Sequence, residues 1–191
     1  MYAVPKILIT GFKPFLGADC NPSEHLSKEV SNQYSEVDSL ILPVEFGRAF
    51  DVLSEQLLRI DYDFVLMLGL GSGRKNIGFE KIGLNWVQSE HRDEAGTLPK
   101  TGRILPDAPL ALMSKVSIDE IFSALKNENH AVEISFSAGT YVCNDLYFRV
   151  LSQFPKLKAV FIHVPGTQEM EIPQQQKTVS RIIELINESG I

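Results

Sequence analysis

Cys143 and His163 stand at positions from which they could act together as a nucleophile and a base. Cys143 begins an expected helix after Ser137-Ala138-Gly139-Thr140, and His163 ends an apolar run. A helix N-terminus carries unpaired N–H groups and partial positive charge, which favour a thiolate and can bind an oxyanion. In a right-handed β-α-β unit, the helix start and the end of the next strand share one edge of the sheet. We therefore expect covalent catalysis, with a thiolate that forms near neutral pH and a histidine base.

Each of the two residues alone also fits a structural role. A lone cysteine in a helix is usually a small buried apolar group. A histidine in an apolar strand is commonly a hydrogen-bonded core residue. Cys20 lies in a loop and has no assigned chemistry. The joint placement of Cys143 and His163 at the edge where sites of α/β folds gather favours the catalytic interpretation.

Other patterns indicate no phosphate or metal site. Gly69-Leu70-Gly71-Ser72-Gly73 follows an apolar run, but Arg74 stands where a dinucleotide fingerprint needs glycine or alanine. The segment also lacks the Gly-Lys-Ser/Thr of a phosphate-binding loop. We interpret it as a tight turn that lets backbones approach closely. The four histidines lack metal-motif spacing, so we expect no metal.

Apolar runs and helical periodicities alternate along the chain. Ser117 and Glu120 fit a capping box at the start of a helix that ends near residue 129. Residues 90–109 are irregular, as long functional loops often are. The other expected helices cover residues 22–32, 46–60, 140–154 and 174–189, and the expected strands cover residues 7–10, 40–44, 64–68, 77–87, 132–135 and 158–163.

This alternation predicts an α/β fold, a three-layer α/β/α sandwich with a mostly parallel twisted sheet. A chain of 191 residues fits one domain, so we expect a single catalytic domain over residues 1–191. Sites of such folds gather where strands end, which directs attention to the loops after Thr10, Leu68, Ser135 and Ile162.

The composition excludes several classes of protein. Hydrophobic residues make up 44% and charged residues 22%, as in ordinary globular proteins. The net charge is −6 and no basic run occurs, so we expect no nucleic-acid partner. No apolar stretch is long enough to span a bilayer, and the N-terminus does not fit a signal peptide. We expect a cytoplasmic protein with no membrane partner and with two reduced thiols.

Four separated motifs, in the right order and over nearly the whole chain, resemble the pyroglutamyl-peptidase I family of cysteine peptidases. One surrounds Cys143, and another is Phe161-Ile162-His163-Val164-Pro165. The other two are Gly73-Arg74 followed by Ile77, Glu80 and Asn85, and Thr10-Gly11-Phe12-x-Pro14-Phe15 followed by Asn21-Pro22-Ser23.

The resemblance implies a catalytic triad of Cys143, His163 and Glu80 with no cofactor. The residues alone do not reveal Glu80, because an isolated glutamate on a strand is more often a solvated side chain. The implied reaction is the removal of N-terminal pyroglutamate from small peptides. This lactam has no ammonium group, so its recognition needs apolar contact and hydrogen bonds. The resemblance places the two N-terminal phenylalanines, Phe12 and Phe15, at the lactam, and Asn21 offers a donor and an acceptor.

The sequence departs from the family pattern at Lys13 and Leu16, at Glu90 (often arginine), and at Asp93-Glu94. We expect these changes to alter rate or leaving-group preference. Bacterial members are often tetramers, so we expect a homo-oligomer with contacts from Trp86 and residues 90–109. Two alternatives stay open: a pseudoenzyme that binds a lactam without turnover, and a hydrolase of another small cyclic amide.

Overall fold

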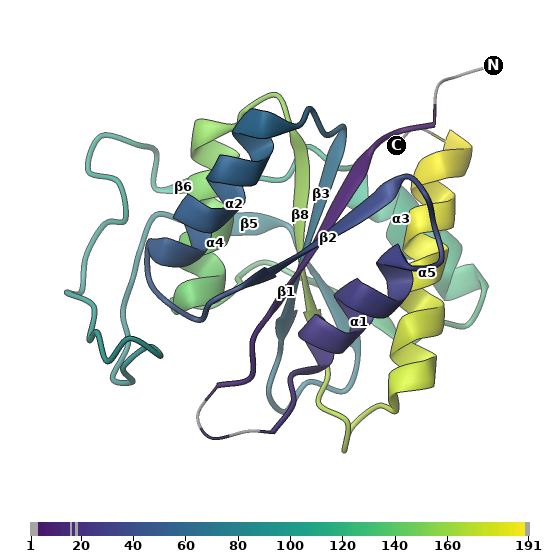
Figure 1. The fold of residues 1–191 in the computed structure, drawn as a ribbon, viewed down its shortest axis with the longest axis horizontal. Helices are drawn as coiled ribbons and strands as arrows, with labels where there is room; N and C mark the ends of the chain where they lie inside the picture. The colour runs from purple at the N-terminus through teal and green to yellow at the C-terminus, as the bar shows by residue number, and fades with distance from the viewer. Residues whose placement is uncertain (1–3, 16, 18, 190–191) are drawn as a thin grey trace.

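The computed structural model describes residues 4–15, 17 and 19–189 (Figure 1). Within these residues, none of the helices is both long and apolar enough to cross a bilayer. The helices are α1 (Pro22–Ser31), α2 (Arg48–Arg59), α3 (Ile118–Asn127), α4 (Val142–Gln153) and α5 (Ile172–Ser189). The strands are β1 (Ile7–Phe12), β2 (Val37–Leu42), β3 (Phe64–Leu70), β4 (Ile77–Glu80), β5 (Ile82–Leu84), β6 (Ala111–Met113), β7 (Val132–Ser135) and β8 (Lys158–Val164).

The main sheet has six strands in the order β2-β1-β3-β8-β4-β7. β2, β1, β3 and β8 are parallel, whereas β4 pairs antiparallel with β8 and parallel with β7. The central strands β1, β3 and β8 are buried on both faces, which explains why their sequences are nearly continuous apolar runs. The expected α/β fold with a mostly parallel sheet is confirmed.

Helices cover both faces of this sheet, giving three layers (Figure 1). α1, α3 and α5 lie on one face, where their apolar side chains join Ile7, Leu66 and Ile162 in one core cluster. α2 and α4 lie on the other face over Leu8, Met67 and Phe161. Alternate residues of each strand therefore point to opposite faces of the sheet and pack into different core clusters. The position of a functional residue along its strand thus decides on which face its side chain lies.

A second, two-stranded sheet lies beyond α4. β5 and β6 are antiparallel, and Gly83 packs against the backbone of Phe148 on α4. A Cβ atom at Gly83 would lie 3.2 Å from the Phe148 Cα atom, so this close approach favours glycine. α4 is thereby held between the main sheet and the small one.

Several local predictions need correction. Residues 77–87 do not form one strand: the chain leaves the main sheet at Lys81, whose N–H donates to Ser135 while its carbonyl accepts from Ser114. Ser117 precedes α3, but its side chain makes no capping hydrogen bond. β6 was not expected, because it has only three residues and both Ala111 and Met113 are exposed. The expected strand 40–44 lies at 37–42 instead. The irregular character of residues 90–109 is confirmed.

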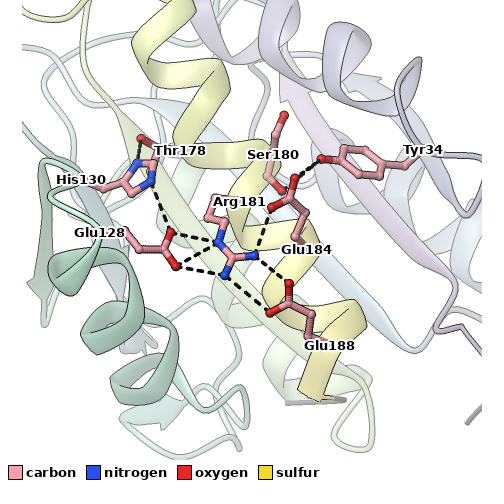
Figure 2. Close-up of polar contacts among 8 residues, drawn as sticks. All are labelled: Tyr34, Glu128, His130, Thr178, Ser180, Arg181, Glu184 and Glu188. Atoms are coloured by element: carbon pink, nitrogen blue, oxygen red, sulfur yellow. Dashed lines mark hydrogen bonds and ion pairs between the residues drawn. The ribbon is translucent and has the colours of Figure 1, made fainter.

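A polar network joins the end of α3 to α5 on the face away from α2 and α4 (Figure 2). Arg181 on α5 donates to Glu128, Glu184 and Glu188. Tyr34 donates to Glu184 from the loop after α1. These contacts connect three segments that are distant in sequence.

Candidate active site

Glu80 and His163 form a buried hydrogen-bonded pair on the adjacent strands β4 and β8, near the C-terminal end of β8. β4 runs antiparallel beside β8, so that Glu80 lies next to Phe161 and Gly78 lies next to His163. Oε1 of Glu80 lies 2.7 Å from Nδ1 of His163. The Glu80 side chain has no exposed surface and that of His163 is 8% exposed. Because Nδ1 is engaged by the carboxylate, Nε2 is left for proton transfer.

Cys143 lies beside this pair. A Cβ atom added at Gly69 would come within 3.2 Å of the Cys143 Sγ atom, so the sulfur lies over Gly69. Gly69 is the direct register partner of His163 on the adjacent strand. Neighbouring strands are about 4.8 Å apart, so the sulfur lies over the strand next to the one that carries the imidazole. Gly69, the first residue of the glycine-rich segment 69–73, thus leaves space for the thiol.

The start of α4 is held in place by residues that follow Cys143. The Asn144 side chain is buried and bonds to both backbone groups of Leu84, accepting at 2.9 Å and donating at 2.8 Å. The Tyr147 hydroxyl donates to the Glu80 carbonyl at 2.8 Å. α4 therefore fixes the positions of both the thiol and the carboxylate. Tyr141, its N-cap, makes no side-chain capping bond, which leaves first-turn N–H groups available to an oxyanion.

The ionisation of Cys143 differs from the sequence-based expectation. Burial is the main cause that raises the pKa of this thiol to about 12, and the nearby Glu80 carboxylate raises it further. A backbone N–H and Arg74 act in the opposite direction without reversing the effect. The prediction of a thiolate near neutral pH is therefore wrong for this structure. The neutral thiol needs a base to remove its proton, and His163 is the neighbouring group that can do so.

Cys143 and His163 meet by a different route from the expected β-α-β unit. β7 is separated from β8 by β4 and runs antiparallel to β8. The chain turns back through residues 136–141 before α4 begins. The sulfur lies over the register partner of His163, but the strand that precedes α4 was assigned the wrong direction.

The two phenylalanines lie near the triad candidates. Phe12 is 3% exposed and its ring centroid lies 6.4 Å from that of Phe161, which lies 4.9 Å from His163. Phe15 lines an open hollow of about 430 Å³ on the same side as Tyr141, two residues before Cys143. Its other lining residues are Gln88, Ser89, Glu90, His91 and Thr140.

Asn21 has a different role from the expected one. It is the N-cap of α1, and its Oδ1 accepts from both N and Oγ of Ser23. Its Nδ2 donates to the Lys13 carbonyl at 3.1 Å. With these bonds in place Asn21 holds the loop that carries Phe15, and its oxygen is not available to a ligand. The exposed Cys20 lies next to it, and Leu16 lies outside the described residues.

Further charged residues near Glu80 were not identified from the sequence. Arg74 donates to Oε1 of Glu80 at 2.6 Å, and Glu133 on β7 contacts the same guanidinium. Arg74 belongs to one of the four motifs that carry the family resemblance, and Tyr141 and Asn144 flank Cys143, but nothing in the spacing shows these contacts. Within the described parts of the chain, no cluster of three or more histidine, cysteine, aspartate or glutamate side chains is arranged to hold a metal ion.

Comparison with known proteins gives a consistent result. The family model described as pyroglutamyl peptidase matches residues 5–188. The pyrrolidone-carboxylate peptidase of Staphylococcus saprophyticus is 33% identical over 178 residues, covering 90% of this chain and 84% of that protein. The enzyme of Thermococcus litoralis is 37% identical over 175 residues, covering 87% and 79% of the two chains.

Solved structures agree. The pyrrolidone carboxyl peptidase of Fervidobacterium islandicum superposes with a TM-score of 0.88 at 30% identity, covering 95% of this chain and 98% of that one. Pyroglutamyl peptidase I of Bacillus amyloliquefaciens gives 0.87 at 27% identity, covering 94% and 95%. With a fold and a family model that both match over nearly all of its length, this chain belongs to the pyroglutamyl peptidase family.

Proposed function

We propose that this protein is a cysteine exopeptidase that hydrolyses N-terminal pyroglutamyl groups from peptides. The observation that carries the proposal is the Glu80–His163 pair at 2.7 Å beside the Cys143 sulfur, in a chain of this family. Residues 1–191 would act as one catalytic domain, since α4 and the central sheet together supply the three groups.

The geometry supports a two-step acyl transfer. His163 accepts the Cys143 proton on Nε2 while sulfur attacks the carbonyl carbon of the pyroglutamyl bond. Glu80 stabilises the imidazolium, and the first-turn N–H groups of α4 bind the oxyanion. His163 then donates its proton to the leaving amine as the C–N bond breaks, giving a thioester. Water attacks this thioester, and its proton passes through His163 back to sulfur as 5-oxoproline is released.

The aromatic side chains near the thiol would recognise the lactam. Phe12 is packed beside Phe161, and Phe15 borders the hollow next to Tyr141. Flat rings offer apolar contact to a five-membered ring that carries no charge. Glu90 and His91 line the same hollow, where the residue after pyroglutamate would also pass.

We further propose that the protein works as a homo-oligomer, with a tetramer as the expected form, in the cytoplasm. Trp86, Leu110, Met113 and Phe136 around β5 and β6 are between 41% and 66% exposed. Apolar side chains gathered in this way favour burial against a second copy of the chain. Both cysteines are free thiols, as a reducing compartment requires. A light-scattering mass near 21.3 kDa at micromolar concentration would contradict the oligomer.

The two alternatives are less favoured. A lactam-binding pseudoenzyme would not need the buried Glu80–His163 pair, and the family comparison names no other cyclic amide.

Hydrolysis of a chromogenic pyroglutamyl amide tests the proposal. The unaltered protein and Cys20→Ser should both be active and should lose activity on treatment with iodoacetamide, more slowly with 5-oxoproline present. Cys143→Ala should lose at least about 10⁴-fold in kcat, because covalent catalysis needs the nucleophile. Activity retained in Cys143→Ala, or lactam binding without product in the unaltered protein, would overturn the proposal.

A further inference from the structure

Arg74 lies behind the Glu80–His163 pair, and the reaction steps above do not use it. Its Nη2 donates at 2.6 Å to Oε1 of Glu80, the same oxygen that lies 2.7 Å from the imidazole of His163. Its Nη1 donates at 3.3 Å to Glu133, and Nη2 also lies 3.4 Å from the Ser135 hydroxyl. The guanidinium thus connects the candidate triad to β7.

The backbone is shaped to admit this side chain. Arg74 follows a turn in which Gly73 has a positive φ of 75°. A Cβ atom at Gly71 would lie 2.7 Å from the Arg74 Cδ atom, and one at Gly78 would collide with Nη1. Both glycines therefore leave the space through which the arginine reaches Glu80. At the far end, Asn76 donates to Glu133 at 3.1 Å and holds that carboxylate.

The charges explain why a cation is needed here. Glu80 is fully buried, and a buried carboxylate without a cationic partner is strongly unfavourable. Arg74, Glu80, neutral His163 and neutral Cys143 together carry no net charge, while the partly exposed Glu133 adds a negative charge on the outer side of the guanidinium. After proton transfer from sulfur to imidazole, the same four groups still sum to zero. Without Arg74 these groups would carry an uncompensated buried negative charge in both states.

We propose that Arg74 is a positioning residue of the reaction, which offsets the buried charge of Glu80 and keeps its Oε1 directed at Nδ1 of His163. The inference rests on the proposed function, because it assigns Arg74 to the same proton transfer. The effect on the thiol is in agreement: Glu80 raises the pKa of Cys143, and Arg74 lowers it. Arg74 therefore offsets the repulsion between the carboxylate and the developing thiolate.

The test compares Arg74→Gln and Arg74→Lys with Arg181→Gln, all in a Cys20→Ser background. Arg181 is the matched control, because its side chain is 23% exposed like that of Arg74 and also pairs with carboxylates. Two rates are measured from pH 5 to 9: hydrolysis of a pyroglutamyl amide, and alkylation of Cys143 by iodoacetamide. Thermal unfolding of each variant is recorded, and rates are measured at least 15 °C below the lowest Tm.

We expect Arg74→Gln to lower kcat by about 100-fold with little change in KM, because general acid-base catalysis contributes effects of this size. Its kcat profile should also change shape with pH, since the positive charge beside the Glu80–His163 pair is then missing. Arg74→Lys keeps the charge, so its kcat should be at least about fivefold higher than that of Arg74→Gln. Arg181→Gln should keep the unaltered profile.

Two results would overturn the role of Arg74. One is kcat in folded Arg74→Gln within about threefold of the parent, and the other is an equal loss in Arg181→Gln. If the parent protein does not hydrolyse the amide, the proposed function fails instead. The alkylation profile then still tests whether Arg74 acts on the thiol through Glu80, because it needs no substrate. An unchanged alkylation profile in both Arg74 variants would also count against the inference.

Discussion

The molecule contains two arginine–carboxylate networks with opposite surroundings. Arg74 and Arg181 have side chains that are each 23% exposed. Arg74 meets Glu80, which has no exposed surface, at 2.6 Å, and Glu133, which is 41% exposed, at 3.3 Å. Arg181 meets exposed partners: Glu128, Glu184 and Glu188 are 39%, 46% and 59% exposed (Figure 2). The arginines are alike in burial, and the difference lies in their partners.

This difference separates the effects that the two networks should have. Around Arg181 the carboxylates are redundant and solvated, so removal of any one leaves the others and water to take its place. Around Arg74 a single oxygen of Glu80 serves both the guanidinium and the imidazole. A change of one atom there leaves a buried group without its partner, which is far more costly. We therefore expect the first network to affect stability slightly and the second to affect catalysis strongly.

The largest expected effect is that of Glu80→Gln, which keeps the shape of the side chain and removes its charge. The amide cannot stabilise an imidazolium and offers Nδ1 either a donor or a weaker acceptor. We expect kcat for a pyroglutamyl amide to fall by about 10³- to 10⁴-fold. Glu128→Gln in the exposed network is the matched control and should change kcat by less than about twofold. Similar decreases in kcat in Glu80→Gln and Glu128→Gln would contradict the proposed difference between the buried and the exposed network.

The second effect concerns the thiol beside the buried network. With its pKa raised to about 12, Cys143 is protonated throughout the neutral range. In Cys20→Ser, alkylation of Cys143 should therefore accelerate about tenfold for each pH unit between 7 and 10, because the thiolate fraction rises in this proportion. A rate that levels off near pH 7 would show a preformed thiolate and would restore the expectation from the helix N-terminus.

Glu90 gives an intermediate case, because it is an exposed carboxylate that lines the hollow near Cys143. Glu90→Arg replaces a charge that repels a developing oxyanion by one that attracts it. Since the position is solvated, we expect kcat/KM to stay unchanged or to rise by up to about fivefold. A tenfold decrease would show that Glu90 contacts the substrate itself, and a comparison of peptides with acidic and basic second residues would then locate that contact.

The smallest effect is expected for Arg181→Gln. Its Tm should fall by about 2 to 4 °C at pH 7, with turnover unchanged. Arg181 lowers the pKa of Glu128 below its ordinary value, so the stabilisation is present above about pH 4.5 and is lost as the pH falls through the folded-state pKa. The Tm difference between the two proteins should accordingly shrink at acidic pH. A difference that grows on acidification would contradict the ionic origin.

The sequence predicts the parts of the fold that depend on local pattern. The run of 64–68 is buried on both faces as expected, and the amphipathic stretch before Ile60 is helical. His163 lies near the end of an apolar strand, as predicted, and so at the side of the sheet where β1, β3 and β8 end. These features follow from periodicity alone, because each depends on residues that are close in sequence.

The remaining features depend on contacts between distant segments. Glu80, Ile82 and Leu84 alternate as in one strand, but the chain changes sheets at Lys81, which no periodicity reveals. Glu80 is buried only because β4 lies between β8 and β7, where Arg74 can reach it. For Asn21 the residue type suggests ligand binding, but in the fold its side chain caps the helix that follows.

The position of β8 at the centre of the sheet has a consequence for the order of assembly during synthesis. β1, β2 and β3 are neighbours and are made first, whereas β4 and β7 can join them only through β8, which is made almost last. A growing chain that ends before residue 158 thus holds two separate pieces of sheet, with the hydrophobic edge of β3 unpaired. Both Glu80 and Cys143 are by then in the chain, but the strand that carries His163 is the one that unites the pieces. Glu80, Cys143 and His163 can therefore come together only after β8 has joined the two pieces of sheet.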